Sequence, residues 1–324
     1  MLKKLFLLGL AVVFSFVFAS SPKAGEYPNR PITLVVPWQA GGLAAWQAQE
    51  LAMEMEKKFK VKVLVNSIPG GSSAKGALAV LKAPADGYTI LQCWIATFAQ
   101  VPLFQDAGYE PLRDFYPLAQ ATNQPVIVAV REDALWKTLK DFLDDAKANP
   151  NKYKWSGAAA LGVQGILLGK LFENEGVIAR KVVYPGTMAA IPDLLGGRID
   201  IAAANFGFLT KHPGKFRALG VFMDERYPFF PDIPTINEQG YEIKNVVPYS
   251  GYAVNRETPE PVVQKLTNTM KEVLTSKDFQ NRLKNKGVWI NYKNPKDFEA
   301  IIKNAIEVMR GPIEELKKKT KKSK

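Results

Sequence analysis

The chain has 324 residues, of which 47% are hydrophobic and 23% charged, so it can form a globular protein with two domains. Its formal net charge of +12 would suggest a nucleic-acid partner if the charge lay in the body of the chain. Much of it lies instead in the lysine-rich segment after Glu314, and the sequence contains neither a zinc-finger spacing nor an RNA-binding aromatic motif. We therefore expect no nucleic-acid partner.

The N-terminus has the pattern of a secretory signal peptide. Lys3 and Lys4 precede an apolar run over residues 5–18, and small residues follow at Ala19 and Ala24. This run is too short to span a bilayer, and no later run approaches the ~20 apolar residues of a transmembrane helix. We assign residues 1–24 to the signal peptide and the start of the mature chain, with cleavage after Ala19 or, alternatively, Ala24. The protein is therefore expected to be exported.

The segment Thr33–Gly42 has the pattern of a strand that ends in a glycine turn. Its apolar residues stop at Pro37, which cannot continue a strand ladder, and Gly41 and Gly42 allow a close approach of backbone or ligand. Apolar residues then recur at positions 44, 48, 51, 52, 55 and 59, which predicts an amphipathic helix from Ala44. The free N–H groups at such a helix start can bind an anion. The alternative is a tight turn without a ligand.

The same pattern of strand, glycine-rich turn and helix recurs along the chain. A second unit runs from the strand Val61–Val65 through residues 66–73 to a helix at Ala74–Leu81, followed by the strand Thr89–Cys93. A strand is expected at Val126–Val130, and Thr138 with Asp141 predicts a capped helix over Leu139–Ala148. This alternation predicts an α/β fold with mostly parallel sheets.

The second half of the chain continues this order and ends in helices. A third turn lies in residues 156–165 after the strand Lys152–Trp155, and a fourth in residues 184–187 before a helix at Met188–Leu195. A strand over Ile199–Ala204 stops at Asn205, and another covers Tyr249–Val254. Thr258 is the expected N-cap of a helix whose first residue is Pro259, and the remainder is predicted to be helical.

The ordered set of these segments resembles the Bug-type (TctC-like) periplasmic substrate-binding proteins of tripartite tricarboxylate transporters. No single motif is specific, but the whole series occurs in order over the mature chain. The matching segments are Tyr27–Ile32, Leu34–Pro37 with Gly41 and Gly42, Asn66 with Pro69–Gly71, Ala83–Ile90, Lys137–Phe142, Ala146–Pro150, Val183–Gly186, Leu194–Gly197, Lys215–Leu219 and Pro231–Thr235.

The resemblance implies an α/β protein with the two-lobed periplasmic-binding-protein fold (type II, Venus flytrap), in which each lobe is a mixed sheet flanked by helices. Lobe 1 would comprise residues 25–122 and 248–324, and lobe 2 residues 123–247. The chain would cross between the lobes near Ala121–Pro125 and Asn245–Tyr249, so that both ends of the chain contribute to lobe 1.

The resemblance also implies a function and a site. The protein would capture a small organic carboxylate, either a di- or tricarboxylate or an aromatic acid, and deliver it to the membrane permease of the transporter. Backbone amides and waters at the turns would hold the ligand, without a cofactor, a metal or catalysis, in a protein expected to be a monomer. The expected ligand-binding residues are Trp38, Gln39, Ala40, Gly41, Gly42, Ser72, Ser73, Trp94, Ala159, Gly162, Gln164, Tyr184, Gly186, Thr187 and Asn205.

Two departures from the family pattern bear on the ligand. Family members commonly carry an aspartate shortly after the first glycine turn, where this chain has Ala44 and Ala45. The third turn has fewer hydroxyl groups than is usual, and Gln39, Leu43, Cys93 and Trp94 suggest a larger and less polar pocket.

Two other functions remain open at this point. An exported binding protein can serve as the ligand sensor of a histidine kinase instead of feeding a permease. More distantly, Ser72 and Lys75 fit the S-x-x-K pattern of exported serine hydrolases, although no Lys-Thr-Gly motif follows. A single histidine, His212, and a single cysteine, Cys93, argue against a zinc site or a Cys/His dyad, and Cys93 is expected to be buried.

Overall fold

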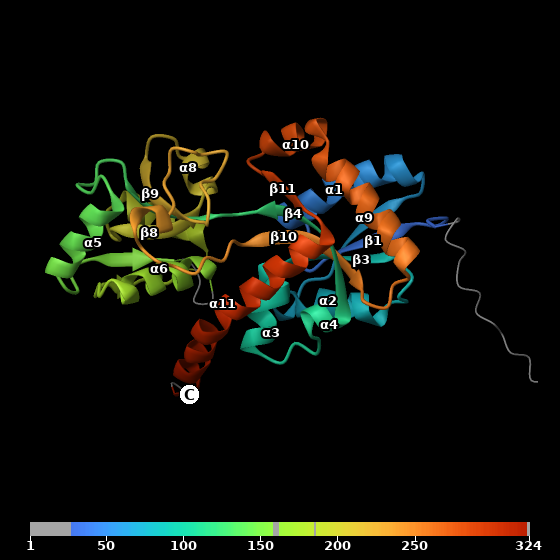
Figure 1. The fold of residues 1–324 in the computed structure, drawn as a ribbon, viewed down its shortest axis with the longest axis horizontal. Helices are drawn as coiled ribbons and strands as arrows, with labels where there is room; N and C mark the ends of the chain where they lie inside the picture. Colours follow the sequence, from blue (N-terminus) through green and yellow to red (C-terminus); the bar gives the residue numbers. More distant parts are fainter. Residues whose placement is uncertain (1–26, 158–161, 185, 323–324) are drawn as a thin grey trace, which may run out of the picture.

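The computed structural model describes residues 27–157, 162–184 and 186–322, and these form two α/β lobes side by side (Figure 1). The predicted signal peptide lies outside the described residues. Within these ranges, no helix is both long enough and apolar enough to cross a membrane.

Lobe 1 is built on a six-stranded mixed sheet with the strand order β11-β4-β10-β3-β1-β2. β1 is parallel to β2 and β3, whereas β10 is antiparallel to both β3 and β4. β1, β2, β3 and β4 therefore run in the same direction and end at the same edge of the sheet. The strands are β1 (Ile32–Val36), β2 (Val63–Ser67), β3 (Thr89–Trp94), β4 (Phe115–Asn123), β10 (Tyr249–Asn255) and β11 (Ile290–Lys293).

Lobe 2 contains a five-stranded mixed sheet with the order β7-β6-β8-β5-β9. β5 is antiparallel to β8 and β9, and β6 is parallel to β7 and β8. The ends of β6, β7 and β8 therefore lie at the edge where β5 begins. The strands are β5 (Val126–Arg131), β6 (Lys154–Ser156), β7 (Arg180–Lys181), β8 (Ile201–Asn205) and β9 (Phe216–Phe222).

Helices cover both sheets. Lobe 1 carries α1 (Leu43–Phe59), α2 (Ala74–Lys82), α3 (Val101–Phe104), α4 (Pro111–Asp114), α9 (Glu260–Thr275), α10 (Lys277–Lys284) and the start of α11 (Pro295–Lys322), with a 3₁₀ turn at Gly71–Ser73 and a π-helical turn at Ala96–Gln100. Lobe 2 carries α5 (Leu139–Ala148), α6 (Val163–Asn174), α7 (Ile191–Leu195) and α8 (Gly207–Lys211), with 3₁₀ turns at Thr187–Ala190 and Asn237–Gln239.

The two lobes are joined by two chain crossings that contact each other. The first is Gln124–Pro125, between β4 and β5, and the second leads into β10 at Tyr249. The backbone N–H of Gln124 donates to the carbonyl of Pro248, with a donor–acceptor distance of 2.7 Å. We propose the lobe division at residues 122/123 and 247/248.

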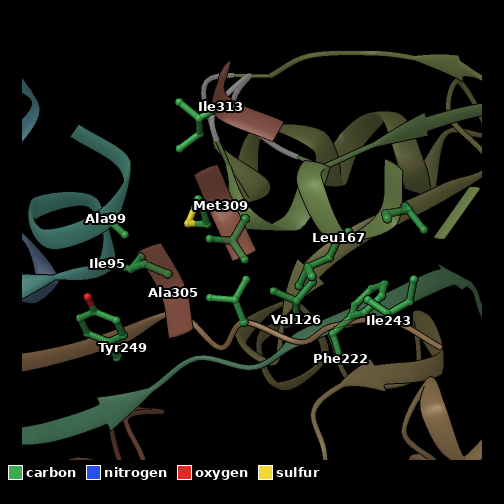
Figure 2. Close-up of a cluster of buried hydrophobic side chains, with 14 of the residues drawn as sticks. Ile95, Ala99, Val126, Leu167, Phe222, Ile243, Tyr249, Ala305, Met309 and Ile313 are labelled. Atoms are coloured by element: carbon green, nitrogen blue, oxygen red, sulfur yellow. The ribbon is translucent and has the colours of Figure 1, made fainter. Parts of the chain in front are cut away.

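The C-terminal helix α11 extends from lobe 1 to lobe 2 (Figures 1 and 2). Its residues Phe298, Ala305, Met309 and Ile313 are fully buried and recur at the spacing of one helix face. Phe298 packs edge-on against Tyr249 of lobe 1, with ring centroids 5.2 Å apart. Met309 and Ile313 belong to one hydrophobic cluster with residues of lobe 2, which include Val126, Leu167, Phe222 and Ile243. The helix therefore fastens the two lobes together on one side of the hinge.

Several local predictions are confirmed and others are wrong. The helix Leu139–Ala148 has the expected bounds, and both hydrogen bonds of the Thr138–Asp141 capping box are present. Cys93 is fully buried, and burial raises the pKa of its thiol. The sheets are mixed and not mostly parallel. Pro259, and not Thr258, is the N-cap of α9, because its ψ of 135° leaves it outside the helix.

Candidate functional site

The predicted turns converge between the lobes. β1, β2 and β3 end at the edge of the lobe 1 sheet from which β4 leads into lobe 2, since Trp94 pairs with Ser250 and Asn123 with Tyr249. Asn205 at the end of β8 pairs with Val126, the first residue of β5. The C-terminal ends of β1, β2 and β3 and those of β6, β7 and β8 therefore face one another across the hinge. We call the space between these two sets of strand ends the interlobe cleft.

A cavity of about 590 Å³ opens at the side of this cleft, next to the hinge, and we call it the hinge cavity. Leu43 and Gln47 of α1 line it from lobe 1, and Met188 and Asn205 line it from lobe 2. Its volume lies within the usual range of ligand sites. The other lining residues are Thr122, Asn123, Gln124, Pro125, Phe206, Gly207, Thr210, Lys211, Tyr227, Lys284, Asn285, Lys286, Gly287, Val288 and Trp289.

Three helices that start at the interlobe cleft have uncapped N-termini. α1, α2 and α6 have neither a side-chain cap nor an acidic residue in the first turn. By contrast, α5 has its capping box, and α9, α10 and α11 each carry an acidic residue in the first turn. Free N–H groups and the positive end of the helix dipole favour an anion at the starts of α1 and α6. At the α2 start, the N–H groups of residues 73–75 already donate to the carbonyls of Gly70 and Gly71, so the helix dipole is the main attraction there.

The turn after β2 has an unusual backbone. Gly70, Gly71, Ser72 and Ser73 all have positive φ, with values of 131°, 55°, 53° and 96°. This region is costly for the two serines, and such strain is common in loops that bind ligands. Ser73 is also 1% exposed, and its Oγ has no hydrogen-bond partner. A buried hydroxyl without a partner can donate to a ligand at little cost.

Other buried polar groups without partners lie at the same edge of lobe 1. They include the indole N–H of Trp94, the Oδ1 of Asn123 and the side-chain amide of Gln47. Trp94 also packs, together with Trp38, against Val36 and the start of α1. This edge therefore combines apolar surface with polar groups that are not satisfied within the protein.

The glycines of the first and third turns have different structural roles. Gly41 has a φ of +80°, whereas Gly42 has an extended backbone, and a Cβ there would meet only the Gln39 carbonyl, at 3.5 Å. In the third turn, a Cβ on Gly157 would lie 2.1 Å from the Cα of Gly165. Gly157 thus permits the close contact between β6 and α6, whereas Gly42 leaves room in front of the α1 start.

On the lobe 2 side, Tyr184 already has a partner. Its hydroxyl donates to Asp193 at 2.6 Å, and Asp193 also forms an ion pair with Arg198. Burial, followed by the hydrogen bond to Asp193, raises the pKa of Tyr184 to about 12. Its ring, with Gly186, Thr187 and Asn205, remains part of the proposed site.

The structure thus places most of the predicted residues at the strand ends and turns that face one another across the hinge, and Asn205 also lines the hinge cavity. In lobe 1, Trp38–Gly42, Ser72 and Ser73 follow β1 and β2, and Trp94 ends β3. In lobe 2, Gly162 and Gln164 lie at the start of α6, Tyr184, Gly186 and Thr187 precede α7, and Asn205 ends β8. Ala159 lies outside the described residues. Sequence reasoning missed Gln47, Asn123, Tyr227 and Trp289. Gln47, a polar residue on the apolar face of a predicted helix, was the only one with a local signal.

Chemistry other than binding finds no support in the described residues. No hydrogen bond joins Ser72 to Lys75, and both side chains are exposed. The described ranges contain no group of three or more His, Cys, Asp or Glu residues that could hold a metal.

Two α/β lobes, joined by two crossings, with helix starts facing each other across a cleft, are the organisation of a solute-binding protein. Residues 47–317 match the tripartite tricarboxylate transporter family receptor, TctC, and the chain belongs to this family of periplasmic solute-binding proteins. A protein from the TAR-I ttuE-ttuC' intergenic region of Agrobacterium vitis is 32% identical over 77% of this chain and 72% of its own length.

Solved structures of similar proteins agree with this assignment. A TctC solute-binding protein from Polaromonas, solved without ligand, aligns with a TM-score of 0.81 and 25% identity over 89% of this chain and 99% of its own. MatC from Rhodopseudomonas palustris, with bound malate, aligns with a TM-score of 0.67 and 26% identity over 89% of this chain and 100% of its own. Rpa4515 from R. palustris, with adipate, aligns with a TM-score of 0.71 and 25% identity over 89% of this chain and 98% of its own.

Proposed function

We propose that this protein captures a small organic carboxylate in the interlobe cleft and delivers it to the permease of a tripartite tricarboxylate transporter. The observation that supports this proposal most strongly is that three helices without N-terminal side-chain caps, α1, α2 and α6, start at the cleft. The N-terminal signal peptide would direct the protein to the periplasm and be removed during export by cleavage after Ala19 or, alternatively, Ala24. Binding would require no cofactor or metal and involve no catalysis.

The donors in the cleft suit a carboxylate. A carboxylate buried without compensation costs several kcal/mol, so it needs hydrogen bonds from the site. The available donors are the backbone N–H groups at the helix starts, the hydroxyls of Ser72, Ser73 and Thr187, and the amides of Gln39 and Asn205. Hydrogen bonds to a charged acceptor are stronger than neutral ones, and the helix dipoles add to them.

Two proteins of known structure that resemble this chain support a carboxylate as its ligand. MatC was solved with malate and Rpa4515 with adipate, two dicarboxylates of different length. We infer that a di- or tricarboxylate, or an aromatic acid, is the ligand of this chain. Residues 44 and 45 are both alanine in this chain, so this position lacks the negative charge of an aspartate, which would repel a second carboxylate.

We infer delivery to a permease, in preference to the two other functions, because the matched family is that of transporter receptors. Sensing by a histidine kinase would use the same cleft, and a neighbouring kinase gene would favour it over transport. Hydrolysis would need Lys75 to activate the Ser72 hydroxyl, but no hydrogen bond joins these two exposed side chains in the described ranges.

A thermal-shift screen against organic acids tests the proposal. A ligand that binds only the folded state stabilises it by RT ln(1 + [L]/Kd), which is about 2.7 kcal/mol at 100 times the Kd. We expect one or more carboxylates to raise the melting temperature, while sugars and cationic amines of similar size leave it unchanged. Stabilisation by sugars or amines, with none by carboxylates, would overturn the proposed substrate class.

A further inference from the structure

The hinge cavity has features that the proposed carboxylate site does not use. Three lysines line it: Lys211 at the end of α8 in lobe 2, and Lys284 and Lys286 near the end of α10 in lobe 1. No aspartate or glutamate is among the lining residues. None of the three lysines forms an ion pair with a described residue, although the Nζ of Lys284 lies 5.7 Å from the ring centroid of Phe229. The lining of the cavity therefore carries a net positive charge.

One wall of the same cavity is aromatic. Phe206 stacks on Tyr227 with ring centroids 4.8 Å apart, and Trp289 meets the Tyr227 ring edge-on at 6.3 Å. All three residues line the cavity. A flat apolar group of a ligand would find rings on which to pack there.

Buried polar groups without partners lie next to this wall. Gln47 is 4% exposed, and neither atom of its side-chain amide has a hydrogen-bond partner. The Tyr227 hydroxyl, in a residue that is 1% exposed, and the Oδ1 of Asn123 also lack partners. Native proteins satisfy most such groups, so a polar ligand or water is expected beside them.

The cavity is also continuous with the proposed site. Leu43 directly follows Gly42, Met188 directly follows Thr187, and Asn205 belongs to both. A ligand held by one carboxylate at the start of α1 could therefore extend into the hinge cavity.

From these observations we propose that the hinge cavity is a second subsite, which takes the body and the outer carboxylate of a long or aromatic dicarboxylate. This proposal rests on the proposed function, because the first carboxylate is held at the helix starts. The rings of Phe206, Tyr227 and Trp289 accept the apolar body. Lys211, Lys284 and Lys286 attract the outer carboxylate from both lobes.

The test compares acids with one and two carboxylates on matched variants. The probes are benzoate, benzene-1,4-dicarboxylate and adipate, titrated calorimetrically into protein dialysed to remove co-purified ligand. The variant carries Lys211→Gln, Lys284→Gln and Lys286→Gln. The control carries Lys137→Gln, Lys265→Gln and Lys271→Gln, which removes the same charge from exposed lysines outside the cavity.

We expect the unchanged protein to bind benzene-1,4-dicarboxylate at least about tenfold more tightly than benzoate and more tightly than adipate. Each exposed charge can change affinity by up to about fivefold, so removal of all three should reduce the advantage of the second carboxylate to within about threefold. Benzoate affinity and the control variant should be unaffected. The higher affinity for the acid with two carboxylates should also decrease at high salt, because salt screens the charges of the exposed lysines.

Other outcomes would contradict the proposed subsite, and they show whether the proposed function fails with it. If the unchanged protein binds carboxylates without preferring a second charge, the carboxylate site stands and the subsite is wrong. The subsite is equally wrong if the triple variant keeps the preference, or if the control loses as much. If no carboxylate binds, both proposals fail.

Discussion

At the scale of single residues, Asp145 stabilises the outer part of lobe 2. Its carboxylate accepts hydrogen bonds from Tyr153 at 2.6 Å, from the indole of Trp136 at 2.9 Å and from Asn149 at 2.8 Å. The Tyr153 hydroxyl, with smaller contributions from Trp136, Lys152 and Asn149, lowers the pKa of Asp145. The rings of Trp136, Phe142 and Tyr153 pack against one another beside it.

We predict that Asp145→Ala lowers the free energy of unfolding by about 1–3 kcal/mol at pH 7, because two aromatic donors lose their partner. The unfolded carboxyl titrates near pH 3.9, whereas the folded one titrates lower. The contribution of Asp145 is therefore present above about pH 4 and is lost as the pH falls through the folded pKa. Denaturant unfolding of both proteins at pH 7 and at pH 3 measures the difference.

Asp144→Ala is the matched control. Its carboxylate pairs only with the exposed Lys140, one turn away, so we expect a loss of no more than about 0.5 kcal/mol. An equal loss for both variants, or an Asp145 effect that does not shrink at low pH, would contradict this account.

At the scale of elements, the sequence predicts helices and buried strands well, and the reasons for the errors are physical. Pro117 argues against a strand over Phe115–Asn123, yet β4 forms there. β11 pairs with β4 only at Gln120 and Thr122, so Pro117 has no neighbour on that side, and a register shift adjoins its pairing with Ala253. β11 has no predicted counterpart because its four residues are all only partly buried.

The interlobe contacts were not predictable from local patterns. The helical period of residues 298–313 shows that one face of α11 is buried, but not that it packs on both lobes. For the site, the turns could be placed because strand–turn–helix units put helix starts at one sheet edge. The hinge cavity could not be predicted from the sequence, because its lining residues come from distant segments: α1, β4, β8, α8 and the segment after α10.

The uncapped helix starts predict that a negative charge added there raises the stability of the protein but lowers its affinity for a carboxylate. Gln164 is the second residue of α6, and Gln164→Glu places a negative charge in the first turn without changing the shape of the side chain. We predict an increase in stability of about 0.3–1 kcal/mol, because the charge complements the helix dipole. Carboxylate affinity should fall at least about tenfold, because the new charge repels the ligand.

Thermal unfolding and calorimetric titration of the same preparation measure both effects. Gln105→Glu adds the same charge at the C-cap of α3, outside the turns that face the cleft, so it should leave the affinity unchanged. At the negative end of that helix dipole, the charge should not raise the stability. Unchanged affinity in Gln164→Glu would mean that the α6 start does not face the ligand.

At the scale of the whole molecule, the lobes are connected on both sides of the hinge. α11 joins them on one side (Figure 2), and on the other side Trp289 of lobe 1 packs against Tyr227, Phe229 and Phe230 of lobe 2. The centroids of these three rings lie 5.8 to 6.3 Å from that of Trp289.

We predict that a bound carboxylate lowers the radius of gyration, because contacts from both lobes stabilise only the closed arrangement. Trp289→Ala should increase the radius of the ligand-free protein, since one of the two lateral contacts is removed. Small-angle scattering with and without ligand measures both changes, and Trp46→Ala, within lobe 1, is the control. An unchanged radius at saturation would indicate a rigid cleft.

The central claim is that backbone donors at the helix starts, and not one basic side chain, hold the carboxylate. Calorimetric titration of Gly42→Val and Lys181→Gln with a carboxylate from the screen tests it most directly. Gly42 has an extended backbone that valine can adopt, so the variant should fold, but its side chain would fill the space before α1. Lys181 is a basic side chain close to the α6 start, where its Nζ would lie 2.9 Å from a Cβ on Gly165. We predict that Gly42→Val abolishes binding and that Lys181→Gln changes the Kd by less than about tenfold, or 1.4 kcal/mol. Intact binding in Gly42→Val, or loss of binding in Lys181→Gln, would contradict the claim.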